Sequence, residues 1–221
     1  MTDRPIIFSA PMIRALLDGR KTQTRRLLSI QGRRGFTEFG PSDTPGYDWH
    51  FRDARMLWHD LRHADLIARL PWAVGDFLWV QEAWNLFALS QDAEESWPVR
   101  SVPRADPRKD DDAVRGHYVV DYAATASDDG PWRPSIHMPR WASRLTLTVT
   151  DVRVQRLQEI SEEDAQAEGV PPFVWVGRHL DAPHRYNFQL LWDELHGSGS
   201  WNANPHVVAL TFTVAQRNID A

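Results

Sequence analysis

The sequence predicts an α+β fold in which short strands form a curved sheet or small β-barrel and short helices flank it. Apolar and polar residues alternate along 143–157, as in a strand with one buried face. Helix start and stop signals frame several short segments, and these do not alternate with strands as they would in a parallel α/β protein. The 221 residues, 42% of them hydrophobic, are enough for one domain with its own core.

The first element expected is a helix over 10–18. Ser9 can cap its first turn, and Pro11 fits within that turn because the N–H that proline lacks has no partner there. Apolar residues then recur at a spacing of four, and Gly19 suits the left-handed residue that commonly ends a helix. The residues after this glycine therefore begin a new element.

The other elements follow from the same kinds of signal. Alternation with β-branched residues predicts strands, whereas capping residues and an apolar helical face predict helices. Two stretches rich in Gly, Pro or charge are expected to be surface insertions, at 29–72 and 86–115. In chain order we expect β-capable residues at 22–30, a short helix around 52–69, strands at 74–84, 117–124 and 143–157, helices at 161–169 and 185–196, and a strand at 206–216.

The charge of the chain is small overall but uneven. The net charge of −5 argues against indiscriminate binding of duplex nucleic acid. Residues 1–34, however, hold eight lysines and arginines against two aspartates, a local net charge of +6. This segment is either a solvated basic face or the place where one anionic ligand is met.

Several classes of protein and site are not expected. The chain lacks an apolar run of membrane-spanning length, a signal-peptide core and cysteine, so we expect a cytoplasmic protein without disulfides. His59 and His63 have the spacing of a zinc-protease pair, but Asp60 replaces the usual glutamate and no third ligand is identifiable. No phosphate-binding loop, dinucleotide fingerprint or nucleophile elbow is present, so neither a metal nor a cofactor is expected.

The run GRKTQTRR at 19–26 carries the candidate chemistry. A threonine hydroxyl becomes a nucleophile when a base stands within hydrogen-bond reach, and Lys21 and Thr24 are three residues apart. Desolvation and neighbouring arginines favour the neutral, basic form of a lysine. A carboxylate would then orient the lysine or handle a proton at the leaving group. The same residues also fit a phosphate contact by Lys21 and a plain strand position for Thr24.

The pattern Gly19-x-Lys21-x-x-Thr24-x-Arg26, directly after a helix, resembles the signature G-x-K-x-x-E-x-R of the ASCH domain family, with threonine in place of glutamate. VGDFLWV, RLTLTVTDVRVQRL and ISEEDAQAEG resemble the Gly-Asp turn and strand, the central strand and the following helix of that family. PSIHMPRWASR and WNANPHVVALTF are similar to its longer phage and prophage version. The resemblance implies one PUA-like β-barrel domain over 1–221, with the two insertions, and an association with RNA.

One small bacterial branch of this family, the N(4)-acetylcytidine amidohydrolases, uses a lysine, a threonine and a glutamate. The motif is similar to that of this branch, and Lys21, Thr24 and Glu168 match its catalytic positions, although those enzymes are shorter. The resemblance implies removal of an acyl group from the exocyclic nitrogen of a modified cytidine. Residues expected to bind the modified pyrimidine nucleoside, or single-stranded RNA, are Arg26, Glu82, Trp79, Trp84 and Arg144.

Two other functions stay open at this point. A non-catalytic RNA- or nucleotide-binding module of a phage or prophage would use the same cleft, with Glu168 an ordinary carboxylate on a solvated helix. A phage-encoded regulator that acts through protein contacts is the third class. A test for turnover of an N(4)-acylated cytidine distinguishes an amidohydrolase from a non-catalytic binding module.

Overall fold

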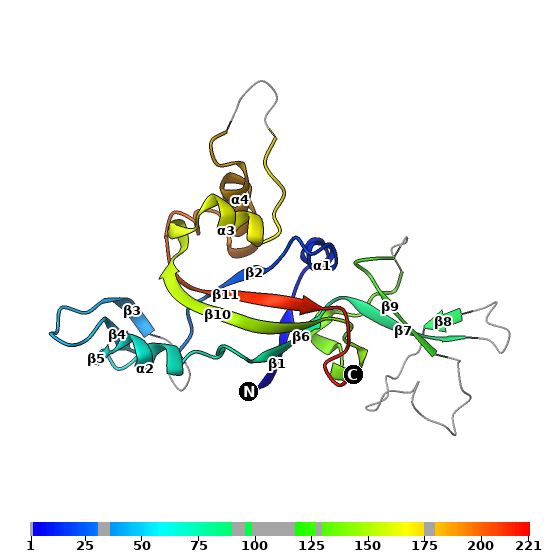
Figure 1. The fold of residues 1–221 in the computed structure, drawn as a ribbon, viewed down its shortest axis with the longest axis horizontal. Coiled ribbons are helices and arrows are strands. Elements are labelled where there is room, and N and C mark those ends of the chain that lie inside the picture. The colour runs from blue at the N-terminus through cyan, green and yellow to red at the C-terminus, as the bar shows by residue number, and fades with distance from the viewer. Residues whose placement is uncertain (1, 31–35, 90–95, 99–117, 127–129, 175–179) are drawn as a thin grey trace. The chain divides into compact units, whose positions relative to one another are not determined.

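The computed structural model describes residues 2–30, 36–89, 96–98, 118–126, 130–174 and 180–221, and it confirms the α+β class (Figure 1). These residues divide into two compact units. We call residues 22–76 and 149–212 unit 1, and residues 2–21, 77–148 and 213–221 unit 2. Strands β10 (Thr146–Arg156) and β11 (His206–Ala215) contribute residues to both units.

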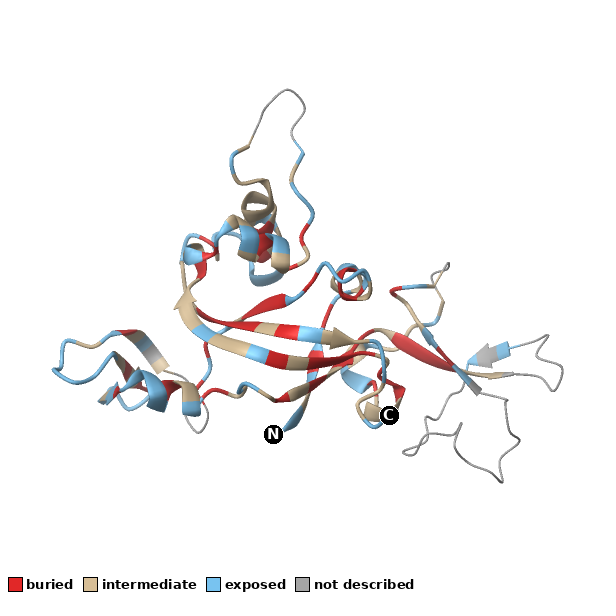
Figure 2. Ribbon diagram, viewed as in Figure 1, coloured by how far each residue is buried: buried red, intermediate tan, exposed pale blue. Residues whose placement is uncertain are grey.

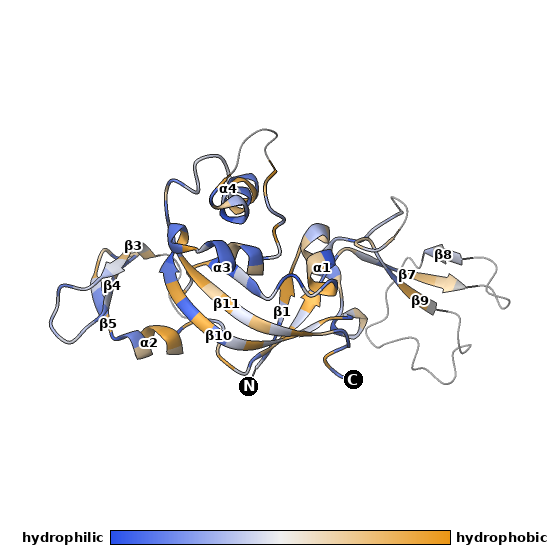
Figure 3. Cartoon of the chain, turned by 45° about the horizontal axis from the view of Figure 1, so that its top comes forward, coloured by the Kyte–Doolittle hydropathy of each residue, from blue (hydrophilic) through white to orange (hydrophobic). Residues whose placement is uncertain are grey.

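In unit 1, strand β2 (Gln23–Leu27) pairs with β11 in antiparallel fashion, which confirms strand structure at the β-capable stretch and near 206–216. Thr24 lies opposite Leu210 in this pairing. Four consecutive residues of β11, from Val207 to Leu210, are fully buried (Figure 2). Figure 3 shows apolar colour over much of this strand, as expected for a strand covered on both faces.

The two helices α3 (Glu162–Ala167) and α4 (Pro183–His196) of unit 1 confirm helical structure near 161–169 and 185–196. The side chain of Ser161 caps α3, as predicted, because its Oγ accepts the N–H of Asp164 at 3.0 Å. None of the described helices has the length and apolar character needed to cross a bilayer. The two helices share a buried apolar cluster with neighbouring residues: Leu157, Ile160, Ala165, Val170, Phe188, Trp192, Trp201 and Val207.

The insertion at 29–72 contains a small sheet, so the helix expected around 52–69 is wrong for most of its length. Strands β3 (Phe36–Pro41), β4 (Trp49–Asp53) and β5 (Trp58–Leu61) pair in antiparallel order, and only α2 (His63–Ala68) is helical. The reason lies at Asp53, whose Oδ1 accepts the N–H groups of Arg55 and Leu57 at 2.9 and 3.0 Å. This side chain closes a turn that returns the chain as a second strand instead of a helix.

Unit 2 combines the first helix with three paired strands. Strand β1 (Asp3–Ile7) runs parallel to β6 (Phe77–Gln81), and β6 pairs in antiparallel fashion with the start of β10. Helix α1 (Ala10–Leu17) confirms the helix predicted after Ser9. Gly19 has a φ of 70°, so it takes the left-handed conformation expected where the helix ends.

A second sheet of unit 2 contains β7 (Trp84–Leu89) between β8 (Ser96–Pro98) and β9 (Tyr118–Tyr122). Strand β9 confirms the strand expected at 117–124, but the strand expected at 74–84 is interrupted. At the break, the N–H of Glu82 points to the sulfur of Met138 at 3.4 Å instead of joining a strand ladder. Most of the insertion expected at 86–115 lies outside the described residues.

Candidate active site

Lys21 belongs to unit 2, where its side chain is enclosed. It has 0% exposed surface, and its Nζ lies 5.4 Å from the centroid of the Phe8 ring. Its backbone N–H donates to the carbonyl of Ala15 at 3.0 Å, which ties it to the end of α1. Lysines on a solvated basic face extend into water. The burial of Lys21 therefore excludes that interpretation for this residue.

In unit 1, strand β2 begins beside the end of α3. The N–H of Thr22 donates to the carbonyl of Ala167 at 2.8 Å, and the carbonyl of Thr22 accepts from Phe212 at 2.9 Å. Thr24, two residues further along, is buried, and so is Glu168, which directly follows α3. The structure thus brings the strand of the threonine and the helix of the glutamate to the same part of unit 1.

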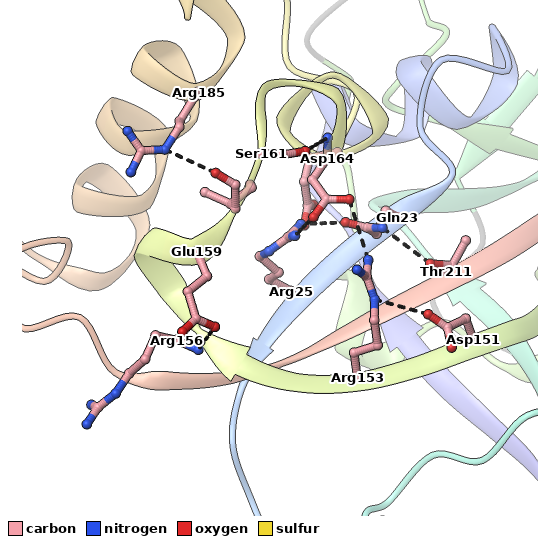
Figure 4. Close-up of polar contacts among 12 residues, drawn as sticks. Gln23, Arg25, Asp151, Arg153, Arg156, Glu159, Ser161, Asp164, Arg185 and Thr211 are labelled. Carbon is pink, nitrogen blue, oxygen red and sulfur yellow. Dashed lines mark hydrogen bonds and ion pairs between the residues drawn. The ribbon is translucent and has the colours of Figure 1, made fainter. Parts of the chain in front are cut away.

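Arg25 is the centre of this part of unit 1, with a fully buried guanidinium (Figure 4). Its Nη1 donates to Gln23 Oε1 at 2.6 Å and to Glu168 Oε1 at 3.1 Å. Its Nη2 donates to Asp164 Oδ2 at 2.7 Å. One guanidinium thereby holds two carboxylates of the α3 segment. It orients the carboxylate of Glu168 and pairs with its negative charge.

Asp164 shows how the charges in this cluster balance. Burial opposes its ionisation, but the positive charge of Arg25, a hydrogen bond from Gln23 and the more exposed Arg153 together outweigh burial and lower the pKa of the carboxyl. Asp164 is consequently ionised at neutral pH. The cluster therefore contains at least one negatively charged carboxylate in addition to Glu168.

Arg26 and His196 are two further titratable groups of unit 1, and the first of them lies near Glu168. Burial lowers the pKa of the Arg26 guanidinium, and the negative charge of Glu168 partly opposes this shift. Burial and then the charge of Arg26 lower the pKa of His196, the last residue of α4, whose ring lies 4.1 Å from that of Trp192. His196 is therefore a neutral imidazole at neutral pH, able to accept a proton.

In unit 2, Glu82 and Arg144 form a two-pronged ion pair. Arg144 Nε donates to Oε1 at 2.8 Å and Nη2 donates to Oε2 at 2.9 Å. The guanidinium carbon lies 4.0 Å from the centroid of the Tyr122 ring, and Nη1 donates to Thr125 Oγ1 at 3.2 Å. Each of the three nitrogens of this guanidinium thus has a partner. These contacts hold the Arg144–Glu82 pair in place.

The carboxyl of Glu82 is only 2% exposed, and burial raises its pKa although Arg144 opposes the shift. A carboxylate oxygen has lone pairs left after accepting one hydrogen bond from the arginine. The role of Glu82 as an acceptor for the pyrimidine edge stays a prediction.

The two tryptophans expected to stack a base differ in their surroundings. Trp84 is fully buried and meets Trp141 edge to face, with ring centroids 6.0 Å apart, so it packs in the core of unit 2. Trp79 is half-buried and lies opposite Pro5 and Thr146 in the sheet. Of the two, Trp79 alone keeps a partly accessible ring.

The histidine pair of the insertion has structural partners. His59 lies on β5 and its Nε2 is 2.9 Å from Asp53 Oδ2, while His63 Nδ1 accepts from the indole of Trp49 at 3.3 Å. The two histidines therefore do not share a helix face. Among the described residues, no group of three or more potential ligand side chains is placed to hold a metal ion.

Cations of the basic N-terminal segment meet groups within the protein itself. Arg20 pairs with Asp18 at 2.7 Å, and Arg14 donates to the carbonyl of Ala124 at 3.0 Å. Arg25 is held by the α3 carboxylates. These three side chains favour neither a free phosphate clamp nor a wholly solvated face.

Sequence reasoning found Thr24, Arg26 and Glu168, which belong to unit 1, and Lys21, Trp79, Trp84, Glu82 and Arg144, which belong to unit 2. It missed Arg25 and Asp164. The available signals were the basic run itself and the acidic first turn of α3, but neither states which charge meets which. Comparison of the chain with protein-family models, curated proteins and solved structures finds no match.

Proposed function

We propose that the chain is an amidohydrolase that removes an acyl group from the exocyclic nitrogen of a modified cytidine such as N(4)-acetylcytidine. The observation that carries the proposal is the complete burial of Lys21 within the motif Gly19-x-Lys21-x-x-Thr24-x-Arg26. A desolvated lysine beside an aromatic ring is in the kind of environment where lysines act as bases. A lysine that only contacts phosphate needs solvent access instead.

The proposed roles follow the resemblance to the ASCH amidohydrolases. Lys21 accepts the hydroxyl proton of Thr24, and the threonine oxygen bonds to the acyl carbon. The bond from that carbon to the exocyclic nitrogen breaks, and the nitrogen takes up the proton that Lys21 received, either directly or by way of the Glu168 carboxylate. Water then cleaves the threonine ester and releases the carboxylic acid. In a second version, Lys21 and Glu168 activate water directly and Thr24 orients it.

The proposed substrate contacts come from residues with fixed side chains. Glu82, held by Arg144, accepts from the pyrimidine edge, and the half-buried Trp79 offers a ring for stacking. Arg26, whose side chain lies near Glu168, binds the ribose side or the developing oxyanion. The proposal includes a PUA-like barrel and a cytoplasmic protein, and no step in it uses a metal or a cofactor.

Incubation of the purified full chain with N(4)-acetylcytidine, followed by chromatography of released cytidine, tests the proposal. Lys21→Ala is expected to lower the rate by roughly 10²- to 10⁴-fold. Arg20→Ala is the matched control, because Arg20 is the exposed cationic neighbour. Unchanged turnover in the Lys21 variant would remove this residue from the mechanism.

The role of the hydroxyl is tested within the same run. Thr24→Ala abolishes turnover if Thr24 is the nucleophile, Thr24→Ser retains part of it, and Thr22→Ala changes little because Thr22 is exposed. No turnover by the wild type over a panel of N(4)-acylated cytidines, combined with measurable RNA binding, would contradict hydrolysis. That result would favour the non-catalytic RNA-binding module.

A further inference from the structure

Helix α3 carries Asp164 and leads directly to Glu168, yet it has only six residues. A helix this short is not stable on its own in water, so its position depends on what it packs against. Ala165 of α3 is buried in the same apolar cluster as Phe188 and Trp192 of α4. The placement of Glu168 therefore depends on α4.

Glu162 joins the two helices by capping the second one. The residue at the N-cap position of α4 is Ala182, whose side chain cannot accept a hydrogen bond. Instead, the carboxylate of Glu162 accepts the N–H of His184 at one oxygen and the N–H of Arg185 at the other, both at 2.8 Å. A side chain of α3 thus satisfies the first turn of α4 and meets the positive end of its dipole.

Arg185 makes the reciprocal contact from α4 to the segment that leads into α3. Its Nε donates to the carbonyl of Ile160 at 3.1 Å, and its Nη2 donates to the carbonyl of Gln158 at 2.9 Å. Figure 4 shows the guanidinium directed at this segment. The planar fork of arginine spans both carbonyls, which the single ammonium group of lysine cannot match in geometry.

We propose that Glu162 and Arg185 are positioning residues for Glu168: they clamp α3 to α4 and so fix the carboxylate that Arg25 holds. The catalytic consequence of this clamp rests on the proposed amidohydrolase function. The structural consequence of the clamp, a fixed position of α3, does not depend on that function. The two consequences are measured by separate experiments.

Hydrogen–deuterium exchange tests the clamp without any assay of activity. In Glu162→Gln, one N–H of α4 faces an amide NH₂ group instead of a carboxylate oxygen, so the cap is lost in part. Exchange is expected to become faster in peptides covering 161–169 and 22–26, where Thr22 bonds to Ala167. Glu163→Gln, at the exposed neighbouring position, is the matched control and should match the wild type. Unchanged exchange in Glu162→Gln overturns the clamp.

Kinetics test whether the clamp positions a catalytic group. Glu162→Gln and Arg185→Lys are each expected to lower kcat by roughly 10- to 100-fold, because small misplacements of reacting groups are costly, with KM little changed. The pH at which kcat is half-maximal should also shift. Loss of folded protein, in contrast, would lower kcat at every pH without shifting that midpoint. Wild-type kcat and pH profile in both variants, despite faster exchange, would show a purely structural clamp and overturn the positioning role.

Inactivity of the wild type leaves a distinguishable result. Absence of turnover in every protein removes the proposed function, while the exchange comparison still decides whether Glu162 fixes α3. All kinetic assays are run below the onset temperature of unfolding of the least stable variant, so that folded fractions are equal.

Discussion

Each unit contains an arginine that pairs with at least one carboxylate, but the two clusters balance charge differently. In unit 1, Arg25 is completely enclosed and shared by Glu168 and Asp164. In unit 2, Arg144 keeps 24% of its side chain exposed and pairs with a single described carboxylate, that of Glu82. The pKa of Asp164 is lowered because neighbouring cations outweigh burial, whereas that of Glu82 is raised because burial outweighs its partner.

The comparison shows that an ion pair does not by itself decide which protonation state a buried carboxyl prefers. Asp164 lies at the edge of its cluster, where water reduces the cost of its charge and a second arginine, Arg153, approaches to 3.4 Å. Glu82 is enclosed and has one partner, so desolvation dominates. Removing the partners one at a time, beginning with the most enclosed arginine, separates the two cases.

The largest effect is expected for Arg25→Met. This change removes the ion pair that Arg25 makes with the buried carboxylate of Glu168, and it leaves Asp164 with the more exposed Arg153 as its ion-pair partner. Breaking a buried pair by removing one partner costs about 3–5 kcal/mol, so the free energy of unfolding should fall by this amount. Denaturant unfolding at pH 7 measures the change.

Arg153→Met is the matched control for Arg25, since Arg153 also approaches Asp164 but is 45% exposed. Its loss is expected to cost less than about 1 kcal/mol, as for surface ion pairs. Equal effects of the two substitutions would contradict the view that enclosure, rather than the number of charges, gives the unit 1 cluster its importance.

Arg144→Met is expected to cost about 2–3 kcal/mol at pH 7, because it leaves a buried charged acceptor without its donors. The raised pKa of Glu82 means that the folded state holds this proton more tightly than the unfolded state does. Stability contributed by this group is therefore present at low pH and is lost as pH rises above the ordinary glutamate range. Without Arg144 the pKa rises further, so the deficit relative to the wild type should shrink between pH 7 and pH 5.

Glu82→Gln in the Arg144→Met background separates charge from packing. A neutral amide has no ionisation to suppress, so the double variant should recover most of the lost free energy of unfolding and lose its pH dependence. Denaturant unfolding at pH 5 and pH 7 gives both quantities. A pH-independent deficit in the single variant would show that packing of Arg144 on Tyr122, and not the charge of Glu82, accounts for the loss.

Local signals predicted the elements whose causes are local. The cap at Ser161 and the left-handed turn at Gly19 lie next to the helices they delimit, and both helices form there. At the break between β6 and β7, the N–H of Glu82 meets Met138, 56 residues away, and no pattern within 74–84 reveals this contact. The hairpin at Asp53 depends on a turn closed by one side chain, which is a weak signal in a sequence.

The candidate site also has features that are visible in the local sequence and features that depend on distant residues. The residue types and the spacing of Lys21 and Thr24 are visible in the sequence, and so is the basic character of the run around them. The partner of Arg25 lies 143 residues away, and the burial of Lys21 depends on packing with Phe8. The sequence therefore did not reveal which charges pair or which side chains are buried. These two properties distinguish a reactive group from a solvated one.

Asp164→Asn is expected to lower the free energy of unfolding by about 1–2 kcal/mol at pH 7, less than the loss of Arg25, because Glu168 keeps its partner. The pKa of Asp164 is lowered in the folded state, so its stabilising effect is present above the ordinary aspartate range and lost as pH falls through it. The difference between wild type and variant should thus shrink between pH 5 and pH 3. A difference that grows on acidification would contradict the assigned direction of the shift.

The smallest effect is expected for Arg20→Ala, five residues before Arg25 in the same basic run. Arg20 pairs with Asp18 at 2.7 Å, a distance as short as that between Arg25 and Asp164. Both partners are at least half exposed, however, and water and salt screen such pairs, so the free energy of unfolding should change by less than about 0.5 kcal/mol. If denaturant unfolding showed a loss comparable to that of Arg25→Met, distance and not burial would determine the importance of these pairs. The expected contrast between two arginines at equal contact distance makes this the most direct test of the argument.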